Sequence, residues 1–286
     1  MIWYPRRLGT RVMRTVKGRP RFHRAARSVR FALGSRRAPR TLSGIPGRVH
    51  MNDSMLARAS PEDIASYREG AMNVLALVDE ALAAAHRSDD DVTSWLDFGC
   101  GYGRVIRLLA KRIPPHRITA CDVVAEGVDF CASEFGVRPL HSRESLSSLV
   151  LGTYDFVYAI SVLTHLDEEN SEEFLHLLGD SVAPGGLFLF TTHGSHALEH
   201  PERYGVGYAE RKAELAELVA KRGTAYLPYA FMPSSRYGMA WHSTEYVTVT
   251  MARLHGDRLR LLLHRPRALD GHQDVFVYRA RDELAD

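Results

Sequence analysis

Three glycines at alternate positions, Gly99, Gly101 and Gly103, directly follow an apolar run that ends in Asp97-Phe98. Glycine adopts backbone angles that other residues avoid, and without a side chain it lets a ligand touch the main chain. An amphipathic helical pattern begins after the loop, and the first turn of a helix presents free N–H groups and a positive dipole end. The stretch therefore predicts a strand, a tight loop and a helix that together bind a polar ligand.

The spacing of these glycines separates two classes of ligand. A dinucleotide-binding loop carries G-x-G-x-x-G, with the third glycine inside the helix. Here the spacing is G-x-G-x-G and Asp97 lies two residues before the first glycine, which disfavours NAD. A second acid, Asp122, ends the short predicted strand of residues 117–121. Because a carboxylate at a strand end can accept two hydrogen bonds from a ribose diol, Asp97 and Asp122 together indicate a nucleoside ligand.

Two histidines that follow later predicted strands are candidate general bases. His165 lies in the segment after the predicted strand of residues 154–161, and His193 ends the predicted strand of residues 187–192. Parallel sheets bind ligands at this end of their strands, and an imidazole can take a proton near neutral pH. His193 is the better placed of the two, since His165 fits a loop-shaping role equally well.

The residues from Asp97 to Arg104 resemble motif I of the class I S-adenosylmethionine (SAM) dependent methyltransferases, D-x-G-C-G-x-G-R. The acid Asp122, a fourth-strand motif over residues 155–166 and a Pro-Gly-Gly turn at 184–186 follow in the family's order. The resemblance covers residues 60–194, and 240–280 more loosely. It implies SAM as the cofactor, with the backbone of two residues facing its methionine part, Ile160 and Ser161. The other cofactor-binding residues that it implies are Asp97, Phe98, Gly99, Cys100, Gly101, Gly103, Asp122 and Val123.

The resemblance also implies an α/β fold. This is the three-layer Rossmann-like methyltransferase fold, with a mostly parallel seven-stranded sheet and an antiparallel last strand. We expect helices over 60–87 and 126–135, and a terminal hairpin made of strands 247–251 and 275–278. Thr192-His193-Gly194 and His272-Gln273-Asp274 further resemble a bacterial subgroup associated with surface glycans or glycosylated metabolites.

We predict two parts in the chain: a basic N-terminal arm at 1–58, and a methyltransferase domain at 59–286 with a lid-like insert at about 195–245. The insert is expected to hold a helix over 208–222 and an aromatic-rich loop, but no strand. Its rings suit the flat faces of sugars or aromatic acceptors, or pack on one another. His193, His196 and His200, with Glu199 nearby, could suggest a metal site, but they show no zinc template of fixed spacing. A histidine-rich surface loop is the commoner cause, so we predict no metal site.

Charge is distributed unevenly along the chain. Residues 1–50 hold 14 Lys or Arg and no acid, whereas the rest is acidic. The arm fits a solvated tail, an in-plane helix on an anionic membrane anchored by Trp3 and Tyr4, a nucleic-acid contact or a transit peptide. No apolar run reaches the roughly 20 residues of a membrane span, and the three cysteines show no paired spacing, which is typical of a reducing compartment. We expect a cytoplasmic protein, with peripheral membrane contact as one alternative.

These features predict an enzyme that transfers a methyl group from SAM to oxygen of a small-molecule or sugar acceptor. A methyltransferase acting on RNA or protein is one alternative; the basic arm favours it, but no base-stacking motif or N-P-P-Y-type signature is present. A SAM-binding protein without catalytic activity is the other, because catalytic residues in this fold are few and variable.

Overall fold

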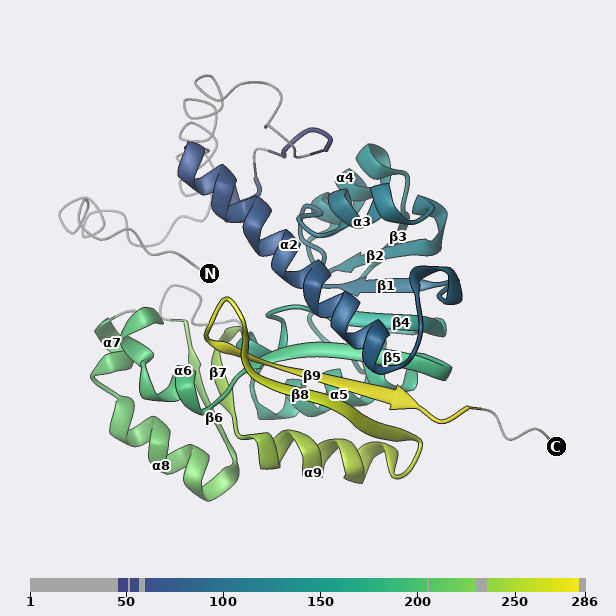
Figure 1. Ribbon diagram of the computed structural model, residues 1–286. Helices are drawn as coiled ribbons and strands as arrows, with labels where there is room; N and C mark the ends of the chain where they lie inside the picture. The colour runs from purple at the N-terminus through teal and green to yellow at the C-terminus, as the bar shows by residue number, and fades with distance from the viewer. Residues whose placement is uncertain (1–45, 51, 57–59, 205, 230–235, 283–286) are drawn as a thin grey trace.

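The computed structural model describes residues 46–50, 52–56, 60–204, 206–229 and 236–282 (Figure 1). The amphipathic pieces expected within the arm, together with Trp3 and Tyr4, lie outside these ranges. No helix in the described ranges is long and apolar enough to cross a membrane.

A seven-stranded sheet forms the centre of the molecule, in the order β3-β2-β1-β4-β5-β9-β8. Strands β1 to β5 are parallel to one another, whereas β9 is antiparallel to both of its neighbours, β5 and β8. The expected fold class is therefore confirmed. The chain order reverses at β1, and open α/β sheets bind ligands at such a switch point. The strands are β1 (Trp95–Phe98), β2 (Ile118–Asp122), β3 (Arg138–His141), β4 (Tyr154–Ala159), β5 (Val182–His193), β8 (Leu259–Leu269) and β9 (Gln273–Ala280).

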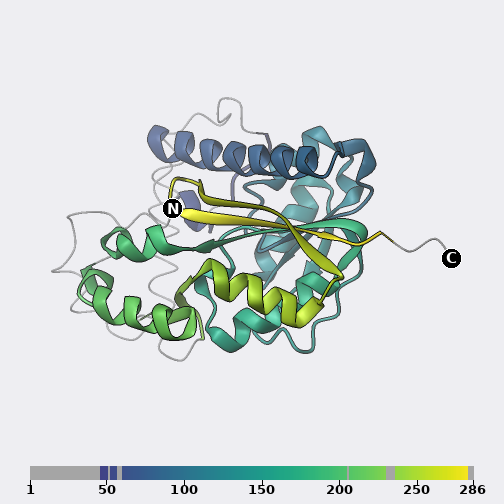
Figure 2. The ribbon, with the colours of Figure 1, turned by 60° about the horizontal axis from the view of Figure 1, so that its bottom comes forward.

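Helices cover both faces of this sheet, which gives three layers (Figure 2). On one face lie α2 (Pro61–Ala84), α3 (Ile106–Arg112) and α4 (Ala125–Phe135); on the other lie α5 (Glu168–Asp180) and α9 (Thr244–His255). Successive strand residues point to opposite faces: in β5, Leu187 and Leu189 join the first core, and Phe188 and Phe190 join the second. Both faces of β5 are buried at these positions, so residues 187–190 are apolar without alternation.

Helix α2 begins where the sequence indicates. The Ser60 side chain caps it by accepting a hydrogen bond from the backbone N–H of Asp63 at 3.2 Å, and Pro61 occupies the first helical position. Glu62 and Asp63 stand near the positive end of the helix dipole. The helix expected over 60–87 and the one expected over 126–135 are both confirmed.

The strand expected at 247–251 is wrong, because these residues belong to helix α9. Ser243 caps this helix by accepting from the N–H of Tyr246 at 3.0 Å. Val247, Thr250 and Met251 then share one buried helical face, so packing outweighs the strand preference of their β-branched side chains. The neighbour of β9 is instead β8, an edge strand whose Pro266 lies where the register shifts between Arg265 and Leu269.

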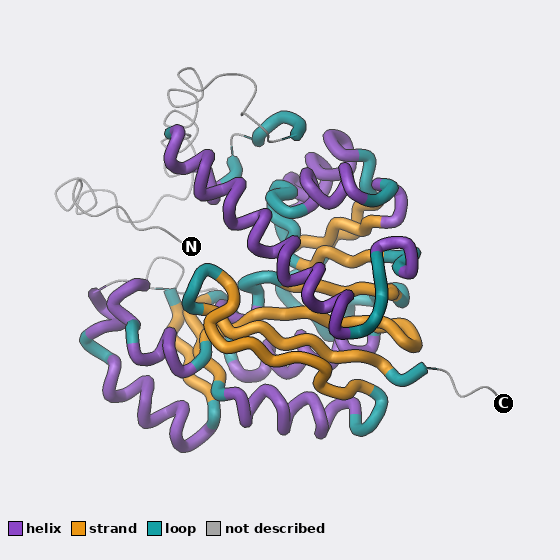
Figure 3. The backbone as a smooth tube through the Cα atoms, in the orientation of Figure 1, coloured by secondary structure: helices purple, strands orange, loops and turns teal. Residues whose placement is uncertain are grey.

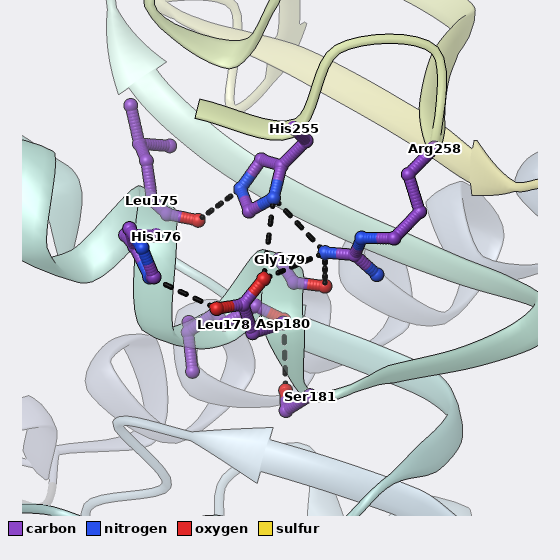
Figure 4. Close-up of polar contacts among 8 residues, drawn as sticks. All are labelled: Leu175, His176, Leu178, Gly179, Asp180, Ser181, His255 and Arg258. Atoms are coloured by element: carbon purple, nitrogen blue, oxygen red, sulfur yellow. Dashed lines mark hydrogen bonds and ion pairs between the residues drawn. The ribbon is translucent and has the colours of Figure 1, made fainter. Parts of the chain in front are cut away.

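Helices α5 and α9 meet at a polar cluster around His255 (Figure 4). Its Nε2–H donates to the Leu175 carbonyl at 3.1 Å, and its Nδ1 accepts from Arg258, which also donates to Asp180 at 2.9 Å. A Cβ atom at Gly179 would lie 2.2 Å from His255 Nε2, so the close approach requires glycine there. Burial lowers the pKa of His255. The cluster joins the two helices and does not line the pocket described below.

The insert contains strands, contrary to the prediction. A two-stranded antiparallel sheet, β6 (Thr224–Pro228) and β7 (Gly238–His242), packs with the insert's helices at one end of the central sheet (Figure 3). Leu215, Leu227 and Trp241 belong to its own small core. The helix expected over 208–222 is shorter, and the other helical turns precede it. The shorter helix is α8 (Lys212–Arg222), and the turns before it are α6 (Ser195–Glu199), η5 (Pro201–Tyr204) and α7 (Val206–Ala209).

Part of the segment before α2 lies against the domain. Arg107 of α3 donates to the backbone carbonyls of Pro46 and Arg48 at 3.2 Å each, and Arg48 pairs with Glu134 of α4 at 2.7 Å. Tyr67 of α2 donates its hydroxyl proton to Asp53 at 2.9 Å. These contacts connect the segment to three helices close to the glycine loop.

Candidate functional site

A pocket of about 1890 Å³ opens at the carboxyl ends of β1, β2, β4 and β5. Eleven of the twelve predicted site residues line it, both candidate bases included; Gly103 alone of the set does not. Its wall also includes Tyr237, one of the aromatic residues expected in the insert, and three insert residues that were not predicted, Arg203, Tyr204 and Met239. The pocket thus has one side built by the sheet and another built by the insert.

The three loop glycines have positive φ angles but different surroundings. A Cβ atom at Gly99 would lie 2.4 Å from the Val162 side chain, and one at Gly103 would lie 2.7 Å from the Phe135 ring. A Cβ atom at Gly101 would meet no described atom within 4 Å. Gly99 and Gly103 therefore serve the packing of the loop, whereas Gly101 leaves its backbone open to the pocket.

Two acids flank the loop: Asp97 is buried and Asp122 is half-buried. Asp122 accepts hydrogen bonds from the N–H groups of Gly101 and Val124, both at 2.8 Å. An ionised carboxylate has about four lone-pair positions, so about two remain for a ligand. Asp97 accepts from the Tyr158 hydroxyl at 2.9 Å. Burial raises the pKa of both carboxyl groups, that of Asp97 to about 7.

Ser161 holds a left-handed backbone conformation, with φ at 60°. Its N–H donates to Thr191 Oγ1 at 2.8 Å, and Gln273 Nε2 donates to its Oγ at 2.9 Å. Thr191 in turn donates to Gln273 Oε1 at 2.7 Å. Such a conformation costs a non-glycine residue roughly 1–3 kcal/mol, and this network across β4, β5 and β9 offsets the cost. The sequence analysis did not identify Thr191 or Gln273 as site residues, because 112 positions separate Gln273 from Ser161.

Both candidate bases are anchored to strand β7 of the insert. His193 Nδ1 lies 3.0 Å from the Ala240 carbonyl, and His165 Nδ1 lies 2.9 Å from the Gly238 carbonyl. A carbonyl oxygen only accepts, so Nδ1 carries the proton in each ring and Nε2 is left as an acceptor. Burial lowers the pKa of His193 well below its ordinary value and that of His165 to about 4. Both imidazoles are therefore neutral at pH 7.

Two further histidines lie near these bases but differ in access to the pocket. His272 lines it, and its Nδ1–H donates to the Asp270 carbonyl at 3.1 Å. Its ring centroid is 6.0 Å from that of His193. His242 does not line the pocket; it is buried beside Thr224, with 2.9 Å between its Nδ1 and the Thr224 hydroxyl.

Comparison with known proteins assigns the fold and the loop to a family. A family model described as "Methyltransferase domain" matches residues 61–249, well over half of the chain. The protein belongs to the methyltransferase domain family. Membership of this family implies SAM as the cofactor.

Individual relatives are more distant. This methyltransferase is 33% identical over 129 residues to a malonyl-[acyl-carrier protein] O-methyltransferase of Chlorobium luteolum, a match that covers 42% of this chain and 47% of the relative. It is 32% identical over 108 residues to an uncharacterized methyltransferase of Mycobacterium tuberculosis, covering 37% of this chain and 53% of the relative. The alignments thus span about half the length of these curated relatives.

Solved structures of methyltransferases are similar at lower identity. A SAM-dependent methyltransferase of Clostridium acetobutylicum is 11% identical with a TM-score of 0.48, and the match covers 75% of this chain and 92% of that one.

The residues present fit the cofactor that the family implies. Gly101 leaves an open cradle at the loop, and Asp122 retains acceptor positions suited to a ribose diol. Ile160 and Ser161 line the same pocket. Ligand pockets usually measure about 300–1,000 Å³, so the volume here leaves room for an acceptor beside the cofactor.

Proposed function

We propose that this methyltransferase transfers a methyl group to a hydroxyl oxygen of a small-molecule or sugar acceptor. SAM supplies a methyl group that is already activated on a sulfonium. The protein's own residues then have to align the acceptor, exclude water and take up the hydroxyl proton. The observation that carries the proposal is the state of His193, which lines the pocket at the end of β5 with its proton fixed on Nδ1.

His193 is the proposed general base. Within the described part of the chain its Nε2 has no hydrogen-bond partner, so the lone pair is free to accept the hydroxyl proton. A neutral imidazole also does not repel the sulfonium cation, whereas a protonated one would. We assign His165 to positioning, because Gly238 and the Tyr229 hydroxyl, at 2.8 Å, both contact its Nδ1.

The insert supports the choice of acceptor. Tyr204 lines the pocket, and its ring centroid lies 4.6 Å from that of His193. The Tyr204 hydroxyl is buried without a hydrogen-bond partner in the described ranges. An aromatic face with a polar tip suits a sugar or a hydroxylated ring. The Chlorobium luteolum relative is named for transfer to oxygen. The resemblance of residues 192–194 and 272–274 to a glycan-associated subgroup points the same way.

The test uses tritium-methyl SAM, a host extract and the purified protein, with products separated into lipid, glycan, small-molecule, RNA and protein fractions. We expect label in the glycan or small-molecule fraction. His193→Asn should lower its incorporation at least a hundredfold, in line with the usual effect of a general base. His116→Gln, a change at an exposed site, is the matched control. Label confined to RNA or protein would contradict the proposed acceptor class, and equal labelling by His193→Asn would contradict the proposed base.

A further inference from the structure

A second cluster of potential ligand atoms lies on α6, outside the pocket wall. His196, Glu199 and His200 bring one imidazole nitrogen or carboxylate oxygen each to within 4.8 Å of one another. Ligand atoms around a tetrahedral zinc ion, each at about 2.0–2.2 Å from the metal, are about 3.4 Å apart. Small side-chain rotations would close this difference.

The helix explains the convergence. Residues four apart lie on the same helical face, and the His196 and His200 ring centroids are 4.6 Å apart. In metallopeptidase helices of the H-x-x-E-H pattern, the two histidines bind zinc, a match that the prediction of no metal site did not take into account. Glu199 is a third candidate ligand on geometry alone, because its carboxylate lies near both imidazoles. The turn is held firmly, since Ala197 is buried in the insert's core and Lys212 donates to the Glu199 carbonyl at 2.6 Å.

Each ligand atom is available for a metal. His196 Nε2 is buried and has no hydrogen-bond partner in the part of the chain that is described. His200 Nδ1 lies 3.2 Å from Glu202 Oε1, which leaves Nε2 of that ring as the coordinating nitrogen. A carboxylate behind a histidine is the usual outer partner of a metal-binding imidazole.

We propose that His196, Glu199 and His200 form a binding site for a divalent transition metal of the zinc class. Two imidazoles and one carboxylate match the nitrogen and oxygen ligands of zinc, with a fourth position left to water. Glu202 would orient His200 and add a negative charge beside the ion.

The position of the site suggests what the metal would do. Helix α6 begins two residues after His193, and Glu202 belongs to η5, the turn that also carries Arg203 and Tyr204 of the pocket wall. A metal held by α6, with His200 bonded to Glu202, would fix η5 against α6. The bound metal would stabilise the side of the pocket that the insert builds. The proposed metal site does not depend on the acceptor proposed above.

The test measures zinc binding to the full chain, freed of metal with a chelator and carrying no histidine tag. Isothermal titration with Zn²⁺ should show one site with a dissociation constant in the micromolar range. Co²⁺ should give visible absorption bands typical of four ligands that include nitrogen. The double variant His196→Gln, His200→Gln should lose the site, and Glu202→Gln should weaken it about tenfold, as outer-partner changes do.

His116→Gln is the matched control, because it removes one exposed histidine from another part of the surface, and it should bind zinc like the original protein. Circular dichroism without metal shows whether each variant is folded. Two results would overturn the proposal: no stoichiometric binding at 100-fold excess zinc, or equal binding by the folded double variant.

Discussion

Gly101 and Gly103 belong to one loop but meet different surroundings, and this difference predicts two different defects. Alanine at either position must adopt a left-handed conformation, which costs roughly 1–2 kcal/mol. At Gly103 the new methyl group would also meet Phe135 at 2.7 Å and Cys131 at 3.0 Å. We expect Gly103→Ala to be the less stable variant in urea unfolding. Gly101→Ala should lose only the roughly 1–2 kcal/mol of unfolding free energy that the left-handed conformation costs. It should nevertheless bind SAM at least tenfold more weakly, because its methyl group would occupy the open space in which the ligand approaches the backbone. Equal SAM binding by Gly101→Ala and the original protein would contradict the cradle.

Gln273 supports the Ser161 backbone, so its removal should affect one half of the cofactor. Gln273→Leu leaves Thr191 and Ser161 without their shared partner, and Ser161 can then leave its strained conformation. We expect the affinity for SAM to fall about tenfold, or about 1.4 kcal/mol. The affinity for adenosine, which lacks the methionine part, should not change, because Asp122 and Gly101 are untouched. Titration calorimetry with both ligands makes the comparison. A parallel loss of adenosine binding would indicate general disruption instead of positioning.

Strand β7 anchors its own buried histidine as well as the two candidate bases, and this makes stability depend on pH. His242 Nδ1 lies 2.9 Å from the Thr224 hydroxyl, and its Nε2 lies 3.3 Å from the Leu163 carbonyl oxygen. Burial lowers the pKa of His242 to about 4. Below the ordinary pKa of about 6.5, the unfolded chain binds a proton that the folded chain does not. The free energy of unfolding therefore falls as the pH drops from 6.5 toward 4, by about 1.4 kcal/mol at pH 5.5 for one such group.

The measurement compares urea unfolding at pH 7.5 and 5.5 for the original protein and for His242→Gln. Between these two pH values, the free energy of unfolding of the variant should fall by about 1.4 kcal/mol less than that of the original protein. The comparison is needed because Asp97 acts in the opposite direction: its pKa is raised to about 7, so the folded chain takes up a proton first as the pH falls. Identical pH dependence in the two proteins would show that His242 is not held neutral.

At the level of elements, the features predicted correctly from the sequence are those that neighbouring residues determine. The glycine loop, the cap of α2 and the acid at the end of β2 are each set by residues adjacent in sequence, and the structure places them as expected. The alternation of residues 247–251 indicated a strand, but the capping serine and the contact with α5, which involves distant residues, made a helix. Strands β6 and β7 are five residues each, with nine residues between them, so no continuous apolar pattern marked them. The Ser161 network could not be predicted from the sequence either, because its residues lie at the ends of three strands that are far apart in the chain.

At the scale of the whole molecule, charge separates the arm from the domain. Residues 1–45 hold 13 Lys or Arg and no acid, whereas the rest of the chain is net acidic. Each basic residue near an anionic membrane surface contributes about 1 kcal/mol of attraction, which salt screens. We predict that the full chain co-sediments with vesicles containing phosphatidylserine at low salt, and less so at 0.5 M salt.

Deletion of residues 2–45 should abolish this co-sedimentation. The cut preserves residues 46–56, because Pro46 and Arg48 bond to Arg107, and Asp53 bonds to Tyr67 beside the glycine loop. SAM binding by the shortened chain therefore serves as the control for folding, and it should equal that of the full chain. Neutral phosphatidylcholine vesicles should retain neither protein.

Unchanged co-sedimentation after the deletion would rule out the arm as the membrane contact. Salt-sensitive retention of the full chain on RNA, with none on vesicles, would instead favour the nucleic-acid alternative. Because His193 belongs to the domain and lies outside the deleted residues, either result leaves its proposed chemistry to be tested by itself.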